Sequence, residues 1–222
     1  MHAFLGSVSG ENSAPLPRAG DPAESDNSAG GDSALIVGVN WLGDSIMSMP
    51  GIQAFRRANP GIRLVMLVKP KCRSLWSMHP AIDEVLDCPE TVFGTMRARA
   101  VVRRRKFSAA FILPLSFRSA LVPFLARIPR RVGLPGHSRD WMLTRVVNPR
   151  LAPGRMHQRY EYMEVFGMTD SVPEQPRLTA PDEVVAQVRR QLGHEGVMRI
   201  GLLPGAARGP SKRWPADFFA ET

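Results

Sequence analysis

The 222-residue sequence contains only two cysteines and no long apolar run. Cys72 and Cys88 have neither the spacing of a metal site nor that of a disulfide framework, so we expect two free, partly buried thiols in a reducing compartment. No stretch approaches the length of a transmembrane helix. No basic residue precedes Arg18, which does not fit a signal peptide. The sequence therefore predicts a soluble folded part without a metal site.

Two common nucleotide-binding patterns are also absent. Gly38 and Gly43 do not have the G-x-G-x-x-G spacing of dinucleotide-binding proteins. Lys212 is followed by Arg213, whereas a Walker A motif would have Ser or Thr there. We therefore expect no nicotinamide cofactor and no other resident cofactor.

Acidic residues are missing between Arg97 and Arg131, although that interval contains ten basic residues. The whole chain has a net charge of +9, and residues 1–32 are acidic, so the remainder is more basic still. Such an excess favours nucleic acid, an anionic membrane surface or phosphorylated substrates. A simpler interpretation of Arg103 to Lys106 is that cations stabilise a helix C-terminus. Nucleic acid is not expected, because the nearby aromatic residues fall in apolar patterns typical of a core: Phe107, Phe111, Phe117 and Phe124.

The chain is organised around residues 35–58. The apolar run Leu35–Val39 predicts a strand buried on both faces, as in a parallel sheet. A short polar turn over residues 40–44 follows, and then apolar residues at three- and four-residue spacing predict a helix to Ala58. This is the first half of a βαβ unit, whose turn lies where open α/β sheets bind ligands.

The rest of the chain repeats this alternation. We expect further strands at residues 63–68, 84–87, 107–113, 131–134 and 199–203, and helices at 70–78, 92–106, 116–126, 157–166, 181–192 and from 215 onward. The pattern predicts an α/β fold with a doubly wound, mostly parallel sheet, the 35–39 strand central and helices on both faces. The expected organisation is a disordered tail (1–32), a Rossmann-like domain (33–172), a linker and helix (173–195), and the first strand, loop and helix of another domain (196–222).

Several residues near predicted strand ends are candidates for a site. Asp44 is either the N-cap of its helix or a general base at the mouth of a cleft, and spacing alone leaves both possibilities open. The small residues of the 204–212 loop, with Lys212, could bind a phosphate through backbone N–H groups and charge. Lys69, Arg118 and Arg139 follow strands and could anchor phosphates or carboxylates.

Three stretches resemble one enzyme family: NWLGDSIMSMPGIQAFRRANP (40–60), LPLSFRSALVPFLARIPRRVGL (113–134) and LLPGAARGPSKRWPADFFAE (202–221). They are similar to the ADP-heptose:lipopolysaccharide heptosyltransferases of glycosyltransferase family 9, and the last two to the heptosyltransferase II group. The resemblance implies a two-domain GT-B fold and an inverting reaction in which Asp44 is the base. It further implies donor contacts at Lys212 and along the loop backbone, namely at Gly205, Ala206, Ala207 and Arg208. Trp41 joins Lys69, Arg118 and Arg139 as an expected acceptor contact.

The implied donor is ADP-L-glycero-D-manno-heptose, and the implied acceptor is heptosyl-Kdo-lipid A at the cytoplasmic face of the inner membrane. We expect a monomer in peripheral contact with that anionic surface, and a chain too short at its second domain to transfer heptose by itself. Two alternatives remain open. One is a related ADP-sugar transferase with another acceptor, and the other is a non-catalytic basic module that binds anionic lipid or RNA.

Overall fold

The computed structural model describes residues 33–88, 91–150 and 157–193, together with residues 196, 198, 200–202, 205–206 and 212–221. The elements are β1 (Ser33–Val37), α1 (Leu42–Ala58), β2 (Arg63–Val68), η1 (Pro70–Cys72), α2 (Arg73–Ser77), β3 (Glu84–Asp87), α3 (Val92–Arg104), β4 (Ala109–Ile112), α4 (Phe117–Leu125), β5 (Arg130–Gly133), η2 (Asp140–Met142), β6 (Arg145–Val146), α5 (Gln158–Val165), α6 (Asp182–Leu192) and α7 (Ala216–Ala220). The predicted disordered tail, 1–32, lies outside the described residues.

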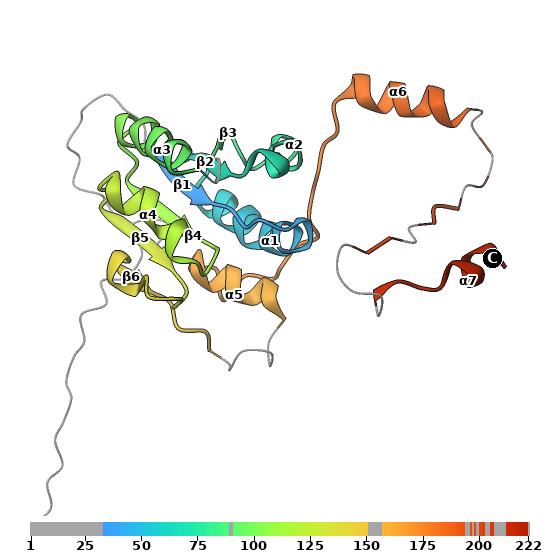
Figure 1. The fold of residues 1–222 in the computed structure, drawn as a ribbon. Coiled ribbons are helices and arrows are strands. Elements are labelled where there is room, and N and C mark those ends of the chain that lie inside the picture. Colours follow the sequence, from blue (N-terminus) through green and yellow to red (C-terminus); the bar gives the residue numbers. More distant parts are fainter. Residues whose placement is uncertain are drawn as a thin grey trace, which may run out of the picture. The chain divides into compact units, whose positions relative to one another are not determined.

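The strands form a six-stranded sheet in the order β3-β2-β1-β4-β5-β6, and every neighbouring pair is parallel. The β1 strand lies inside the sheet, between β2 and β4 (Figure 1). The chain adds β2 and then β3 on one side of β1, and β4, β5 and β6 on the other side. The direction of the strand order therefore reverses between β1 and β4. This confirms the predicted doubly wound α/β fold with a central first strand.

Both faces of the sheet are covered by helices. Along β1 the side chains alternate, so that Ile36 faces a core with α1, α2 and α5 while Leu35 and Val37 face a core with α3 and α4. Each of these side chains is buried, which explains the continuous apolar run in the sequence. The core on the α1 side includes an aromatic contact between Phe55 and Phe111, whose ring centroids are 4.9 Å apart.

Helices α1 and α5 approach each other closely at a glycine. A Cβ on Gly51 would lie 3.2 Å from the backbone nitrogen of Met163 and the carbonyl oxygen of Tyr162. At the end of α5, Gly167 adopts a φ of 70°, the left-handed conformation that glycine commonly adopts just after a helix. These two glycines fix how α5 packs on α1 and where its chain turns away.

Three local predictions differ from the structure. Helix α1 begins at Leu42, earlier than the turn predicted to extend to Asp44. The η2 turn and the two-residue strand β6 were not predicted, because so short a strand produces no apolar run. Phe117 is 41% exposed, so its predicted role in the core is wrong, whereas Phe107 and Phe111 are buried as predicted.

The chain divides into two compact units, Met1–Thr179 and Ala180–Thr222. The first unit includes the segment before Thr179, because both polar groups of the Gln53 amide bind that segment: its nitrogen donates to the Gln175 carbonyl (3.1 Å) and its oxygen accepts from the Arg177 N–H (3.0 Å). The Thr179 N–H donates to the Met78 carbonyl (2.8 Å). The stretch predicted as a linker is thus bound to the sheet domain as far as this residue.

The second unit contains α6 and α7, and neither helix buries a residue. A strand was predicted over residues 199–203, but the described residues of that range, 200–202, lie in no strand, and Ile200 is 76% exposed. Trp214 contacts Phe219 with ring centroids 4.8 Å apart. Among the described residues of both units, no helix is long and apolar enough to cross a membrane.

Candidate functional site

A pocket lies at the carboxyl edge of the sheet, where the strand order reverses between β1 and β4. Each strand from β1 to β4 contributes the residues that follow it: Asn40 after β1, Lys69 after β2, Cys88 after β3 and Ser116 after β4. Such a reversal point is where open α/β sheets bind ligands, because the two connecting loops diverge there. The pocket has a cavity volume of about 130 Å³, which is room for a small group such as a phosphate or carboxylate and less than a drug-sized ligand occupies.

Two cations converge in this pocket. Lys69 and Arg118 both line it, and both act electrostatically on the thiol of Cys88. Burial raises the pKa of Cys88, while the charges of Arg118 and Lys69 act in the opposite direction. None of the described residues that line the pocket is acidic. The pocket therefore has a net positive lining suited to a phosphate or carboxylate.

Asp44 lies at the same edge of the sheet but does not line this pocket. It is half-buried in the first turn of α1, where Trp41 is the N-cap residue and no side chain caps the helix. The N-cap interpretation of Asp44 is therefore wrong, although its charge still suits the positive end of the helix. Tyr162 is buried, and burial raises the pKa of its phenol. The negative charge of the nearby Asp44 carboxylate raises this pKa further.

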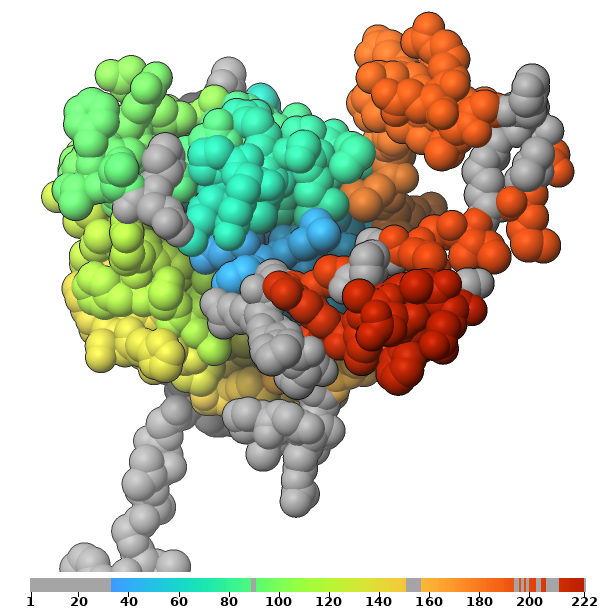
Figure 2. Space-filling view, turned by 45° about the vertical axis from the view of Figure 1, so that its right-hand side comes forward, coloured from blue at the N-terminus to red at the C-terminus, as the bar shows by residue number. Residues whose placement is uncertain are grey.

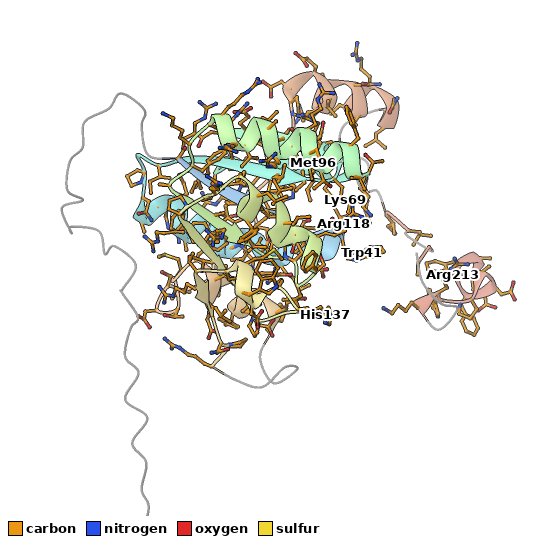
Figure 3. The ribbon with its side chains drawn as sticks, turned by 60° about the vertical axis from the view of Figure 1, so that its left-hand side comes forward. Trp41, Lys69, Met96, Arg118, His137 and Arg213 are labelled. Carbon is orange, nitrogen blue, oxygen red and sulfur yellow. The ribbon has the colours of Figure 1, made fainter. Side chains whose placement is uncertain are left out.

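Trp41 and Lys71 stand beside the start of α1. Trp41 is 48% exposed, and the Lys71 ammonium nitrogen lies 4.9 Å from the centroid of its indole ring. A cation over an aromatic face limits the freedom of both side chains. Figure 3 shows Met96, Lys69, Arg118 and Trp41 along one side of the domain.

Arg139 does not reach this surface, and its predicted contact with an acceptor does not fit its position. Its side chain is fully buried and donates to the Leu134 carbonyl (2.6 Å), the Ser119 hydroxyl (3.1 Å) and the Pro114 carbonyl. Gly136 leaves room for the Arg139 side chain, because a Cβ at position 136 would lie 2.8 Å from the Nε of Arg139.

The buried guanidinium of Arg139 instead ties together two loops at the edge of the sheet. One of them, which we call the Arg118 loop, spans residues 113–119, from the end of β4 into the first turn of α4. It contributes the pocket residues Pro114, Ser116, Arg118 and Ser119. Burial lowers the pKa of Arg139, but arginine stays charged at any physiological pH. Arg139 thus positions the loop that carries Arg118.

The predicted donor contacts belong to the second unit. Lys212 and Gly205 are exposed, and Ala206 is half-buried. The Ala206 carbonyl accepts hydrogen bonds from the Arg213 guanidinium at 3.0 and 3.2 Å. Ala207 and Arg208 lie outside the described residues. The predicted role of this loop in phosphate binding stays a prediction.

Sequence reasoning missed several pocket residues: Asn40, Cys88, Thr95, Ser116 and Ser119. A positional signal could have found three of them, since Asn40, Cys88 and Ser116 each follow a predicted strand closely and must lie at its carboxyl edge. Thr95 and Ser119 belong to helices, where nothing in the local sequence separates a pocket residue from its neighbours.

Comparison with known proteins identifies the fold. The chain is similar to the structure of Escherichia coli ADP-heptose LPS heptosyltransferase II, with a TM-score of 0.72, 26% identity and coverage of 85% of this chain and 59% of that one. A glycosyltransferase family 9 structure from Veillonella parvula has the same TM-score at 20% identity, covering 86% and 57%. The architecture is therefore the Rossmann-like sheet domain of a GT-B glycosyltransferase.

The sequence comparisons define the family. Residues 95–222 match Glycosyltransferase family 9 (heptosyltransferase), and the chain belongs to this family. Lipopolysaccharide heptosyltransferase 2 of E. coli (strain K12) is 31% identical over 203 residues, which cover 84% of this chain and 58% of the relative. Lipooligosaccharide heptosyltransferase 2 of Haemophilus ducreyi is 29% identical over 201 residues with the same coverage. The chain thus spans 58% of the length of these curated relatives.

Proposed function

We propose that the protein is the acceptor-binding part of an inverting transferase that moves heptose from ADP-L-glycero-D-manno-heptose to heptosyl-Kdo-lipid A. The observation that carries the proposal is the pocket at the β1–β4 reversal. Lys69 and Arg118 line this pocket together, at the edge of the sheet where Asp44 lies in the first turn of α1. The relatives named lipopolysaccharide heptosyltransferase 2 support the choice of substrates.

In this proposal Asp44 is the general base. Its carboxylate takes the proton of the acceptor hydroxyl, the resulting oxygen attacks the anomeric carbon of the heptose, and the bond to ADP breaks with inversion. General base catalysis contributes about 10²- to 10⁴-fold to such reactions. Positioning of the two substrates and stabilisation of the leaving diphosphate must supply the rest.

Lys69 and Arg118 hold an anionic group of the acceptor. Arg118 can bind a carboxylate or phosphate through two parallel hydrogen bonds, and Lys69 adds a point charge. Arg139 keeps the Arg118 loop in place without touching the acceptor. Trp41 offers an exposed ring against which a sugar can pack, and the Lys71 ammonium group contacts that ring.

The leaving diphosphate is assigned to the loop that includes Gly205, Ala206, Ala207 and Arg208, with Lys212 as its charged side chain. The protein acts as a monomer in the cytoplasm, at the inner face of the inner membrane. Its basic residues attract it to that anionic surface.

The proposal is tested by joining this chain to the part of the E. coli relative that the match does not cover, and by measuring transfer from ADP-heptose to a truncated lipid A acceptor. Asp44→Asn should lower turnover at least 100-fold while leaving donor binding unchanged, because the shape is kept and the proton acceptor is lost. Asp217→Asn, at an exposed helix start in the second unit, is the matched control and should have no effect.

Turnover of the Asp44→Asn fusion within threefold of the parent would show that another group is the base. Binding of lipid or RNA with no transfer by the parent fusion would favour the non-catalytic alternative.

A further inference from the structure

Exposed apolar side chains gather at the start of α3. Val92 and Phe93 are 78% and 79% exposed, and Met96, one turn further along, is 41% exposed. Thr95, which precedes Met96 in the chain, lines the pocket between the first turns of α3 and α4. This apolar group therefore borders the pocket on its α3 side.

A second apolar group borders the same pocket from α4. Leu115 and Phe117 are 45% and 41% exposed and flank the pocket residue Ser116 in the chain. Phe117 contacts Trp141, which is 63% exposed, with ring centroids 6.3 Å apart. Figure 2 shows α3, α4 and the segment near η2, coloured green to yellow, as one continuous side of the domain. We call these six residues the apolar rim: Val92, Phe93, Met96, Leu115, Phe117 and Trp141.

The rim residues on α3, Val92, Phe93 and Met96, belong to neither of the two buried cores of the domain. Single exposed apolar residues are ordinary on protein surfaces, but a cluster of large ones around a polar pocket marks an interaction site. The buried face of α3 is made of other residues, among them Ala98 and Val102, which belong to the core of the domain. Removing Phe93 or Met96 would therefore leave that core intact.

The charges around the rim indicate what it contacts. No acidic residue occurs from Thr91 to Arg139, and the exposed surface of α3 continues from the rim into Arg97, Arg103 and Arg104. Arg105, in contrast, is paired with Glu84. Exposed apolar side chains beside exposed basic residues on one helix surface are typical of a segment that lies in the interface of an anionic bilayer. A second copy of this chain would bring the same basic surface against it, and the like charges would repel.

We infer that the apolar rim inserts into the interface of an anionic membrane and sets the mouth of the Lys69–Arg118 pocket against the lipid headgroups. Phe93 and Val92 enter the acyl boundary on one side of the pocket, and Phe117 and Trp141 on the other, while Arg97, Arg103 and Arg104 contact lipid phosphates. A lipid-borne acceptor then reaches the pocket without leaving the bilayer. The inference rests on the proposed function only for the identity of that acceptor.

The test measures co-sedimentation of the full 222-residue chain with acceptor-free vesicles of phosphatidylethanolamine and phosphatidylglycerol, and with neutral phosphatidylcholine vesicles. The chain should bind the anionic vesicles, and the triple variant Val92→Ser, Phe93→Ser, Met96→Ser should bind them at least tenfold more weakly. The matched control is Val184→Ser, Val188→Ser, Leu192→Ser on α6, whose residues are 47%, 44% and 57% exposed, and it should stay within twofold of the parent.

A second readout does not depend on that triple variant. The native Trp141 should lose fluorescence in vesicles whose acyl chains carry bromine. Phe93→Trp should increase the quenched part of the emission relative to the parent, whereas Phe218→Trp in α7 should not increase it. Equal anionic-vesicle binding by parent and triple variant, no increase in quenched emission with Phe93→Trp, or equal binding to neutral vesicles would each overturn the inference. A lipid-free dimer that the triple variant converts to a monomer would assign the rim to a second copy instead.

Binding of a deacylated acceptor, measured in parallel, reports on the proposed function separately. It should be the same for the parent and the triple variant. Its absence with vesicle binding intact would contradict the proposed function and leave the membrane inference standing.

Discussion

The two units of the chain use similar sequence patterns with different results. In the sheet domain, apolar periodicity is matched by burial on both faces of the sheet, and α1 alone buries Met49, Ile52 and Phe55. In the second unit, α6 has an equally regular apolar stripe, yet none of its residues is buried, and Val188 is 44% exposed. Local pattern is therefore enough to form a helix, but a packing partner decides whether that helix contributes to stability.

The two units also differ in how firmly hydrogen bonds hold their loops. The pocket of the first unit is held by buried groups, chiefly the Arg139 guanidinium under the loop that carries Arg118. In the second unit, the Arg213 guanidinium makes the comparable bonds to the Ala206 carbonyl, but it is exposed. A buried hydrogen bond is expensive to break, whereas water replaces an exposed one at little cost.

The largest expected effect is loss of a core aromatic. Phe111→Ala should lower the free energy of unfolding of the sheet domain by about 3–5 kcal/mol, because it leaves a cavity between Phe55 and Phe166. Phe218→Ala in the second unit should change it by less than about 0.5 kcal/mol. Urea unfolding of both variants measures the difference, and equal losses would mean that the two units share one core.

A smaller effect is expected for the two arginines. Arg139→Met should cost about 2–3 kcal/mol in urea unfolding, because the buried carbonyls of Pro114 and Leu134 lose their donor. Arg213→Met should stay within about 0.5 kcal/mol of the parent, since water can reach the Ala206 carbonyl. Unchanged stability in Arg139→Met would show that the loop is held by other contacts.

Acidification should lower the free energy of unfolding of the sheet domain alone, by about 2 kcal/mol. Burial lowers the pKa of His79 from 6.5 to about 4. As the pH falls below 6.5 the unfolded chain binds a proton that the folded chain takes up only near pH 4, so this part of the stability is lost between those two values and stays constant below them. Between pH 7 and 5 the loss is about 2 kcal/mol.

Urea unfolding of His79→Gln at the same two pH values is the control. The glutamine keeps an acceptor for the Ala81 N–H but cannot titrate, so the variant should lose about 2 kcal/mol less than the parent on acidification. The same pH dependence in both proteins would place the effect on other groups.

Much of the sheet domain follows from its sequence, because its signals are local. The strands β2 and β3 have the predicted bounds. The first is an almost continuous apolar run, and the second is a pair of apolar residues between two acidic ones. The strand predicted at 199–203 was wrong over its described residues, because an apolar run forms a strand only where another strand pairs with it.

The site was less predictable than the fold. Lys69 and Arg118 were predicted because each charge follows a strand, and the structure brings them together in one pocket. Arg139 follows a strand in the same way but is buried, and nothing in a linear sequence tells a charge that faces a ligand from one that holds a loop. The exposure of Phe93 and Phe117 was not predicted either, because helical periodicity does not show which apolar residues of a helix pack against another element.

The central claim is that the sheet domain binds the acceptor by itself through Lys69 and Arg118. Calorimetry with deacylated heptosyl-Kdo-lipid A should give residues 33–179 a Kd within threefold of that of the 222-residue chain. Lys69→Gln with Arg118→Gln should weaken binding at least tenfold in both. No binding by residues 33–179, or equal binding by the double variant, would contradict the account.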